Sequence, residues 1–146
     1  MKCKLEKLKV VTRKQMEFVD ITEKVRESVL ASTITSGVAT VFSPHTTASV
    51  KINHNEPMLL QDFMNLFYRI VPMDINYSHD LFEIRTGLGL SERSNGHAHV
   101  KALLMGSSET LPVSDGKLVL GPKQSVFFLE FDGGRERTVY VQVQGE

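Results

Sequence analysis

Side chains that bind metals or move protons are concentrated between Ser43 and Pro57, in the stretch SPHTTASVKINHNEP. Imidazoles can hold a metal ion or exchange protons near neutral pH, and hydroxyls with free backbone N–H groups can line an anion site. The residues with this potential are His45, Thr46, Thr47, His54 and Glu56. A second interpretation stays open, in which the threonines satisfy a turn and the rest is the polar face of a strand.

The other histidines are His79, His97 and His99. His79 lies in a segment without clear periodicity, 72–95, and the other two open a helix predicted to end at Gly106. Side chains two positions apart on a helix point in different directions, so we expect His99, and not His97, to face a shared site. The sequence has no His-Glu-x-x-His motif and no paired cysteines. A metal or catalytic site would therefore need segments that are distant in the sequence.

Two arginines follow the Gly133-Gly134 pair near the end of the chain. Arg135 fits the solvated end of a hairpin. Arg137 comes next in the strand pattern, where it could pair with a buried carboxylate or bind an anion. The residues alone leave these two roles of Arg137 open.

The composition is that of an ordinary globular protein, with 41% apolar and 23% charged residues. Lys and Arg total 17, as do Asp and Glu, and this balance argues against a general nucleic-acid binder. No apolar run is long enough to span a membrane, and the N-terminus lacks the apolar core of a signal peptide. A single cysteine fits a reducing compartment. We expect one cytoplasmic domain over residues 1–146 with no membrane partner.

Hydrophobic periodicity predicts an α+β domain, a compact antiparallel or mixed β-sheet sandwich with three short helices. Strands are predicted at 4–12, 15–21, 37–43, 48–54, 109–113, 117–120, 124–132 and 137–144. Hairpins are expected between the first two strands, at Asp115-Gly116 and at Gly133-Gly134.

The first helix is predicted from an N-cap at Thr22 to a stop before Gly37, and the second from Pro57 to Pro72. The second helix has an apolar stripe that we expect to lie in the core; its members are Leu59, Leu60, Phe63, Leu66, Phe67 and Ile70.

Four motifs occur in order along the chain: HTTASVKINHNEP, YSHD, NGHAHVKALLMG, and a C-terminal segment that begins LPVSDGK and ends VQGE. Together they resemble the YjbQ family over almost the whole chain, from about Leu8 to Glu146. Members of that family are often labelled secondary thiamine-phosphate synthase. The resemblance implies a sheet-sandwich α+β fold, a homotrimer, and polar motifs gathered in a cleft near a subunit boundary.

The resemblance also assigns site residues. The family's motif positions fall on His45, Thr47, Ala48, Glu56, His79, Asn95, Ala98, His99 and Arg137. The chain departs from the family in a longer segment between His79 and Asn95 and in Lys123, where a Trp is usual. These departures concern the choice of substrate more than the fold.

The function that the resemblance implies joins a pyrimidine diphosphate to a thiazole phosphate and expels pyrophosphate, here as a side activity of an enzyme for another phosphorylated small molecule. We expect His45, His79 and His99 to form a metal or acid–base core, with Zn²⁺ or Mg²⁺ as the candidate divalent ion. Glu56 and Asn95 would assist catalysis, and Thr46, Thr47 and Arg137 would contact the anionic substrate. The alternatives are a non-catalytic trimeric module that binds a metal or small ligand, and a purely structural trimer.

His45, His79 and His99 come from segments 34 and 20 positions apart, so no local constraint brings them together. If they serve function, we expect them to meet in one cleft near Glu56, with His54 and His97 facing elsewhere. Asn95 is then expected to fix the tautomer of one of the imidazoles.

Overall fold

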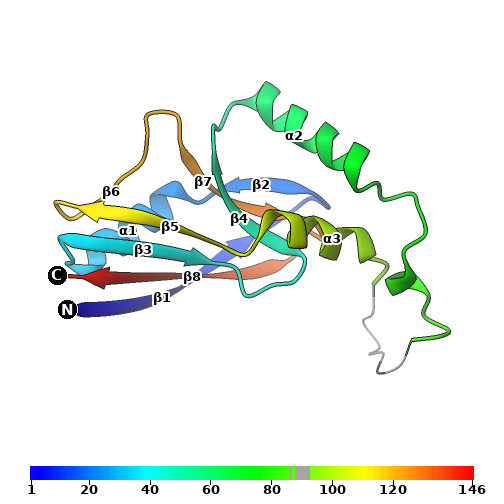
Figure 1. Cartoon of the computed structure of the whole chain (residues 1–146), viewed down its shortest axis with the longest axis horizontal. Helices are drawn as coiled ribbons and strands as arrows, with labels where there is room; N and C mark the ends of the chain where they lie inside the picture. The colour runs from blue at the N-terminus through cyan, green and yellow to red at the C-terminus, as the bar shows by residue number, and fades with distance from the viewer. Residues whose placement is uncertain (86, 88–92) are drawn as a thin grey trace.

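Two antiparallel β-sheets pack against each other in the computed structural model, which describes residues 1–85, 87 and 93–146 (Figure 1). The larger sheet has the order β1 (Lys2–Val11), β8 (Glu136–Gly145), β3 (Ser36–Phe42), β5 (Ser108–Ser114), β6 (Lys117–Leu118). The smaller sheet has the order β2 (Glu17–Asp20), β7 (Ser125–Glu130), β4 (Ala48–Asn53). The predicted α+β sandwich is confirmed.

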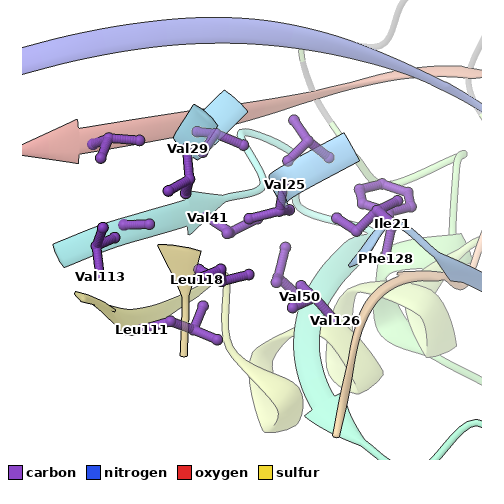
Figure 2. Packing of buried hydrophobic residues seen from close by; sticks show 14 of the residues in the cluster. Ile21, Val25, Val29, Val41, Val50, Leu111, Val113, Leu118, Val126 and Phe128 are labelled. Atoms are coloured by element: carbon purple, nitrogen blue, oxygen red, sulfur yellow. The ribbon is translucent and has the colours of Figure 1, made fainter. Parts of the chain in front are cut away.

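The main core lies between the two sheets and is made mostly of β-branched side chains. Val41 of β3 and Val50 of β4 meet there, and Val25 and Val29 of helix α1 (Thr22–Ser32) pack against them (Figure 2). All four of these side chains are fully buried. Burial of this kind contributes about 1.5–3 kcal/mol for each large aliphatic side chain, so this layer holds the two sheets together.

Strand β7 is buried on both faces, because a second apolar layer covers the smaller sheet. Phe128 faces the main core, whereas Phe127 and Leu129 face the outer layer. Helices α2 (Pro57–Ile70) and α3 (Gly96–Met105) supply that outer layer, and a short 3-10 helix, η1 (Ser78–Asp80), lies against α3.

Two of the three predicted hairpins are wrong. β1 pairs with β8 and β2 pairs with β7, so the chain passes from one sheet to the other between the first two strands. It crosses back at Gly133-Gly134, between β7 and β8. The two crossovers are hydrogen bonded to each other, since Gly133 N donates to Gln15 O at 3.1 Å. A side chain at Gly133 would lie 2.3 Å from Lys14 O, so this glycine permits a close approach of two backbones.

The hairpin at Asp115-Gly116 is confirmed. Val113 pairs with Leu118, and both turn residues have positive φ, 50° and 71°. This is the conformation that Asp-Gly turns favour.

The predicted core role of the α2 stripe is confirmed in part: Phe67 and Leu60 belong to the outer apolar layer, and Phe63 is in ring contact with Phe18. Within α2, all of which the structure describes, Phe67 is the buried residue, while Leu66 and Ile70 are 49% and 52% exposed. The helix covers the smaller sheet only in part. None of the described helices is long and apolar enough to cross a membrane.

Candidate functional site

His45 lies in the connection from β3 to β4, at the end of the sandwich where the chain also passes from β7 to β8. Its Nε2 atom is 3.0 Å from Thr138 N and 3.1 Å from Thr138 O, so the backbone of β8 holds the ring. The edge of Phe128 supports it in a T-shaped contact. His45 is half-buried and fixed in orientation, which suits a group that must present one nitrogen to a ligand.

His79 and His99 lie together, with ring centroids 4.7 Å apart and ring planes at 66°. His99 is on α3, which confirms the helix predicted there, and its ring lies beside Thr46 in a pocket. His79 is on η1. The two elements approach closely because position 96 is glycine: a Cβ there would lie 2.6 Å from the Tyr77 Cβ.

A pocket of about 420 Å³ opens between His45 and His99. Thr46 and Ser107 add polar groups, and α3 with the start of β4 supplies an apolar side through Ala48, Ala102, Leu103 and Gly106. The pocket therefore combines two imidazoles with a small apolar wall, as ligand sites usually do.

Burial lowers the pKa of both pocket imidazoles. For His45 the nearby Arg137 guanidinium adds to this effect, while the hydrogen bond to Thr138 and the Glu130 charge raise the pKa. For His99 the neighbouring His79 adds to the effect of burial, while Asp132 and the backbone of Thr46 oppose it. Both rings are therefore neutral at pH 7, in the form that accepts a proton or a metal ion.

His79 belongs to a hydrogen-bonded chain that reaches a buried carboxylate. His79 Nε2 is 3.1 Å from Asn95 Oδ1, and Asn95 Nδ2 donates to Asp132 Oδ2 at 2.9 Å. Asp132 is 2% exposed and also forms ion pairs with Arg93 and Arg135. The backbone carbonyl of His79 accepts from Arg85 Nη1 at 2.7 Å. Asn95 thus holds the ring of His79, and Arg85 holds its backbone.

Arg137 takes the first of its two predicted roles and pairs with a buried carboxylate. Its guanidinium bonds both oxygens of Glu130 and donates to Thr47 Oγ1 at 2.8 Å. Thr12 Oγ1 also donates to Glu130, at 2.7 Å. These contacts hold Arg137 and Thr47 inside the protein, and their predicted contact with a substrate anion remains a prediction. Thr46 is exposed at the pocket.

Glu56 follows the last residue of β4, whereas His45 precedes the first, so the length of the strand lies between them. Glu56 caps α2: its two carboxylate oxygens accept from Met58 N and Leu59 N, and these hydrogen bonds hold its pKa below the usual value. The sequence predicted a cleft near Glu56, and this position is wrong: the pocket lies between His45 and His99, and Glu56 is beyond the other end of β4. His54 lies next to this end of β4, and His97 is buried with its Nδ1 2.8 Å from Lys101 Nζ.

Within the described ranges 1–85, 87 and 93–146, no three His, Cys, Asp or Glu side chains lie close enough to hold a metal ion. A structural zinc site takes four protein ligands and a catalytic one three. The described residues alone therefore do not supply a fitting donor set for Zn²⁺. The predicted metal role of His45, His79 and His99 remains a prediction, and the longer segment between His79 and Asn95 lies partly outside the described residues.

Sequence reasoning missed Asp132, Glu130 and the position of Arg135 beside Asp132. A signal for Glu130 was present, because a charged residue interrupts the run VFFLEF, and charges in buried strands are rarely left unpaired. Asp132 gave no such signal, since an aspartate before Gly-Gly is typical of a turn.

The family model described as "UPF0047 protein YjbQ-like" matches residues 6–146. A UPF0047 protein of Methanocaldococcus jannaschii is 36% identical over 97% of this chain and 95% of its own length. YugU of Bacillus subtilis, also named a UPF0047 protein, is 36% identical over 97% of this chain and 99% of its own length.

The crystal structure of a YbjQ-like protein of unknown function from Sulfolobus solfataricus superposes with a TM-score of 0.89. The two chains are 33% identical, and the match covers 99% of each. A family member from Clostridium acetobutylicum has a TM-score of 0.84 at 37% identity, over 95% of this chain and 99% of its own. Sequence and fold agree over nearly the whole chain, which therefore belongs to the UPF0047 (YjbQ-like) family.

Proposed function

We propose that the chain is an enzyme that acts on a phosphorylated small molecule, with His45, His99 and His79 as its acid–base groups. One observation carries the proposal: imidazoles from three separate segments gather at one end of the sandwich, two at an open pocket and the third in contact with one of these. Two of them have lowered pKa values, which is common for groups that exchange protons near neutral pH.

Positive charge near the imidazoles supports an anionic substrate. Arg85 lowers the pKa of His99 and Arg135 lowers that of His45, each by less than the opposing effect of a nearby carboxylate, Asp132 or Glu130. Arg135 is also ion paired with Asp132. Guanidinium groups match phosphate oxygens in geometry and stay charged at all physiological pH values. These arginines, with Thr46 at the pocket, are our candidates for holding a phosphate or diphosphate group.

The reaction to test first is the formation of thiamine phosphate. A bond forms between the thiazole nitrogen and the methylene carbon of the pyrimidine, the carbon–oxygen bond to the diphosphate breaks, and pyrophosphate leaves with the electron pair. Donors and cations that meet the charge developing on pyrophosphate would accelerate this step. A divalent ion would add the same stabilisation.

The decisive assay incubates purified protein with the pyrimidine diphosphate, the thiazole phosphate and Mg²⁺, and measures thiamine phosphate. Matched controls are His45→Ala, at the pocket, and His54→Ala, beside the other end of β4. Product that depends on His45 and not on His54 supports the proposal. If the wild-type protein forms no more thiamine phosphate than His45→Ala does, the proposed thiamine-phosphate synthesis is rejected. A ligand found by mass spectrometry of unwashed protein, with no turnover, would favour a binding module instead.

A homotrimer belongs to the same proposal. Met58, Leu66 and Ile70 of α2 are between 49% and 74% exposed, and apolar surface of this kind commonly marks a subunit contact. Light scattering should give three times the chain mass of 16.4 kDa. A monomer mass would contradict the assembly. A cytoplasmic location is also proposed, supported by the single cysteine, Cys3, which is exposed.

A further inference from the structure

Asp132 is the most deeply buried member of the polar chain that leads to His79. It lies in the crossover from β7 to β8, and its side chain is 3% exposed. Its oxygens face Asn95 Nδ2 at 2.9 Å, Arg93 Nη2 at 3.3 Å and Arg135 Nη1 at 3.4 Å. The two arginine side chains are each 42% exposed, and the contact with Asn95 connects Asp132 to the half-buried His79.

The direction of each hydrogen bond in this chain follows from the carboxylate. A carboxylate between two guanidinium groups accepts hydrogen bonds and donates none. The atom of Asn95 that faces Asp132 must therefore be the amide nitrogen. The amide oxygen of Asn95 then faces His79 Nε2 at 3.1 Å, and this oxygen can only accept. His79 Nε2 must carry the proton, and its Nδ1 keeps the lone pair when the ring is neutral.

We infer that Asp132 is a positioning residue that acts through Asn95 to fix the proton of His79 on Nε2, so that Nδ1 is the atom that accepts a proton or binds a ligand. The use of this atom in catalysis rests on the proposed function, whereas the tautomer does not. The amide between the two groups has a physical reason. A carboxylate in direct contact with an imidazole favours the imidazolium, whereas an amide sets the tautomer without adding charge.

Asn95 and His79 are both anchored to helix α3, as a fixed tautomer requires. Asn95 precedes α3, and its carbonyl accepts from Ala98 N and His99 N, so its backbone is part of the helix that carries His99. The segment of His79 is joined to the same helix, because Asp80 Oδ1 accepts from Gly96 N at 3.1 Å. The two imidazoles and the amide therefore keep their relative positions.

Nuclear magnetic resonance of protein labelled with ¹⁵N-histidine tests the inference without a substrate. The ring signals of His79 are assigned as those lost in His79→Gln. In the wild-type protein at neutral pH, the ring proton of His79 should reside on Nε2, and Nδ1 should have the shift of an unprotonated nitrogen. A proton on Nδ1, or one averaged over both nitrogens, would overturn the assignment whatever the variants show.

The variant Asp132→Asn tests whether Asp132 is the cause. An asparagine at position 132 can donate as well as accept, so it no longer forces the Asn95 amide into one orientation. We expect the shift difference between the two ring nitrogens of His79 to narrow and the Nε2–H signal to be lost to exchange with water. Arg135→Gln is the matched control: it removes one ion pair of Asp132 and should keep the signal.

An unchanged His79 signal in a folded Asp132→Asn protein contradicts the role of Asp132. If this variant does not fold, Asn95→Leu is the alternative, because it removes the Oδ1 acceptor of the His79 Nε2–H. This variant should lose the Nε2–H signal, and a signal that persists would contradict the role of Asn95 in fixing the tautomer. The outcome is separate from that of the enzyme proposal. If no thiamine phosphate forms but the tautomer depends on Asp132, the reaction is rejected and the positioning role of Asp132 stands. If product forms but the tautomer does not change in Asp132→Asn, the reaction stands and the positioning role is rejected.

Discussion

Two polar clusters lie at the same end of the sandwich and differ in whether their polar groups are already paired within the protein or are open to a ligand. In the cluster of Glu130, Arg137, Thr12 and Thr47, both charged residues are at most 4% exposed, and each oxygen of Glu130 is bonded. In the cluster of His45, His99 and His79 the rings are half-buried, and two of them line an open pocket. The first cluster is saturated, and the second has room for a ligand.

This difference indicates that the first cluster has a structural role, and it supports the proposed role of the second in binding or catalysis. Arg137 and Thr138 are neighbours in β8, so the ion pair fixes the strand whose backbone holds His45. Thr47, two positions from His45, is bonded to the same arginine. A rigid buried pair thus positions a more open imidazole group. The predictions below test whether the two roles are separable.

The largest effect on stability is expected for Glu130→Ala. The substitution leaves Arg137 buried without its carboxylate, which should lower the free energy of unfolding by about 3–5 kcal/mol. Urea denaturation measures this loss. The matched control is Glu136→Ala, which breaks the exposed pair with Lys9 and should change stability by less than about 0.5 kcal/mol. Similar losses for the two variants would contradict a special role for the buried pair.

His99→Ala is expected to show the opposite pattern. Because its ring is half-buried beside open space, the variant should fold, with a smaller loss of stability than Glu130→Ala. The rate of the proposed reaction should fall by about 10²–10⁴-fold, the usual contribution of a general acid or base. Steady-state kinetics with a melting curve of the same sample separates the two effects. Full activity in a folded His99→Ala protein would remove this residue from the acid–base group.

Acidification should destabilise the folded protein through His45 and His99. The pKa values of His45 and His99 are lowered in the folded chain, whereas an unfolded imidazole has a pKa of about 6.5. Below about pH 6.5 the unfolded chain therefore binds more protons, and stability falls as the pH drops toward the folded values. Urea midpoints between about pH 7.5 and about pH 5.5 should show this decline. His99→Asn should make it shallower, and an identical slope in this variant would contradict the contribution of His99.

The smallest effect is expected for Glu56→Ala. This change removes the side-chain cap of α2 far along β4 from the pocket, so it should lower the melting temperature less than Glu130→Ala does. We expect its effect on the reaction rate to be smaller than that of His99→Ala. An activity loss as large as that of His99→Ala would restore Glu56 to the catalytic group.

The elements of the fold were predictable because their signals are local. Alternation marked β4 and β8, Pro57 marked the start of α2, and Asp115-Gly116 marked a turn whose positive φ angles the structure contains. Strand pairing was not predictable in the same way. Gly133-Gly134 has the sequence of a hairpin turn, but its glycines are needed because another crossover packs against them, and no local pattern contains that contact.

The candidate site shows the same limit. His45 and His99 could be selected from their types and from helix geometry, but Asp132 could not, since its importance comes from Asn95, 37 positions away. The prediction from the α2 stripe failed at Leu66 and Ile70 for a related reason. An amphipathic pattern shows that a face is apolar, and it does not show whether the same chain covers that face.

The alternation along β7 has a consequence for errors in strand pairing. Phe128 and Glu130 point to one side and Phe127 and Leu129 to the other. A slip of one residue would exchange the two sides, since side chains alternate with a period of two. Glu130 would then enter a layer of phenylalanines with no arginine to meet it, at a large desolvation cost. The Glu130 carboxylate therefore helps to specify the register of β7. In the correct register it is paired with Arg137, and a shift by one residue is disfavoured because the carboxylate would be buried without a partner.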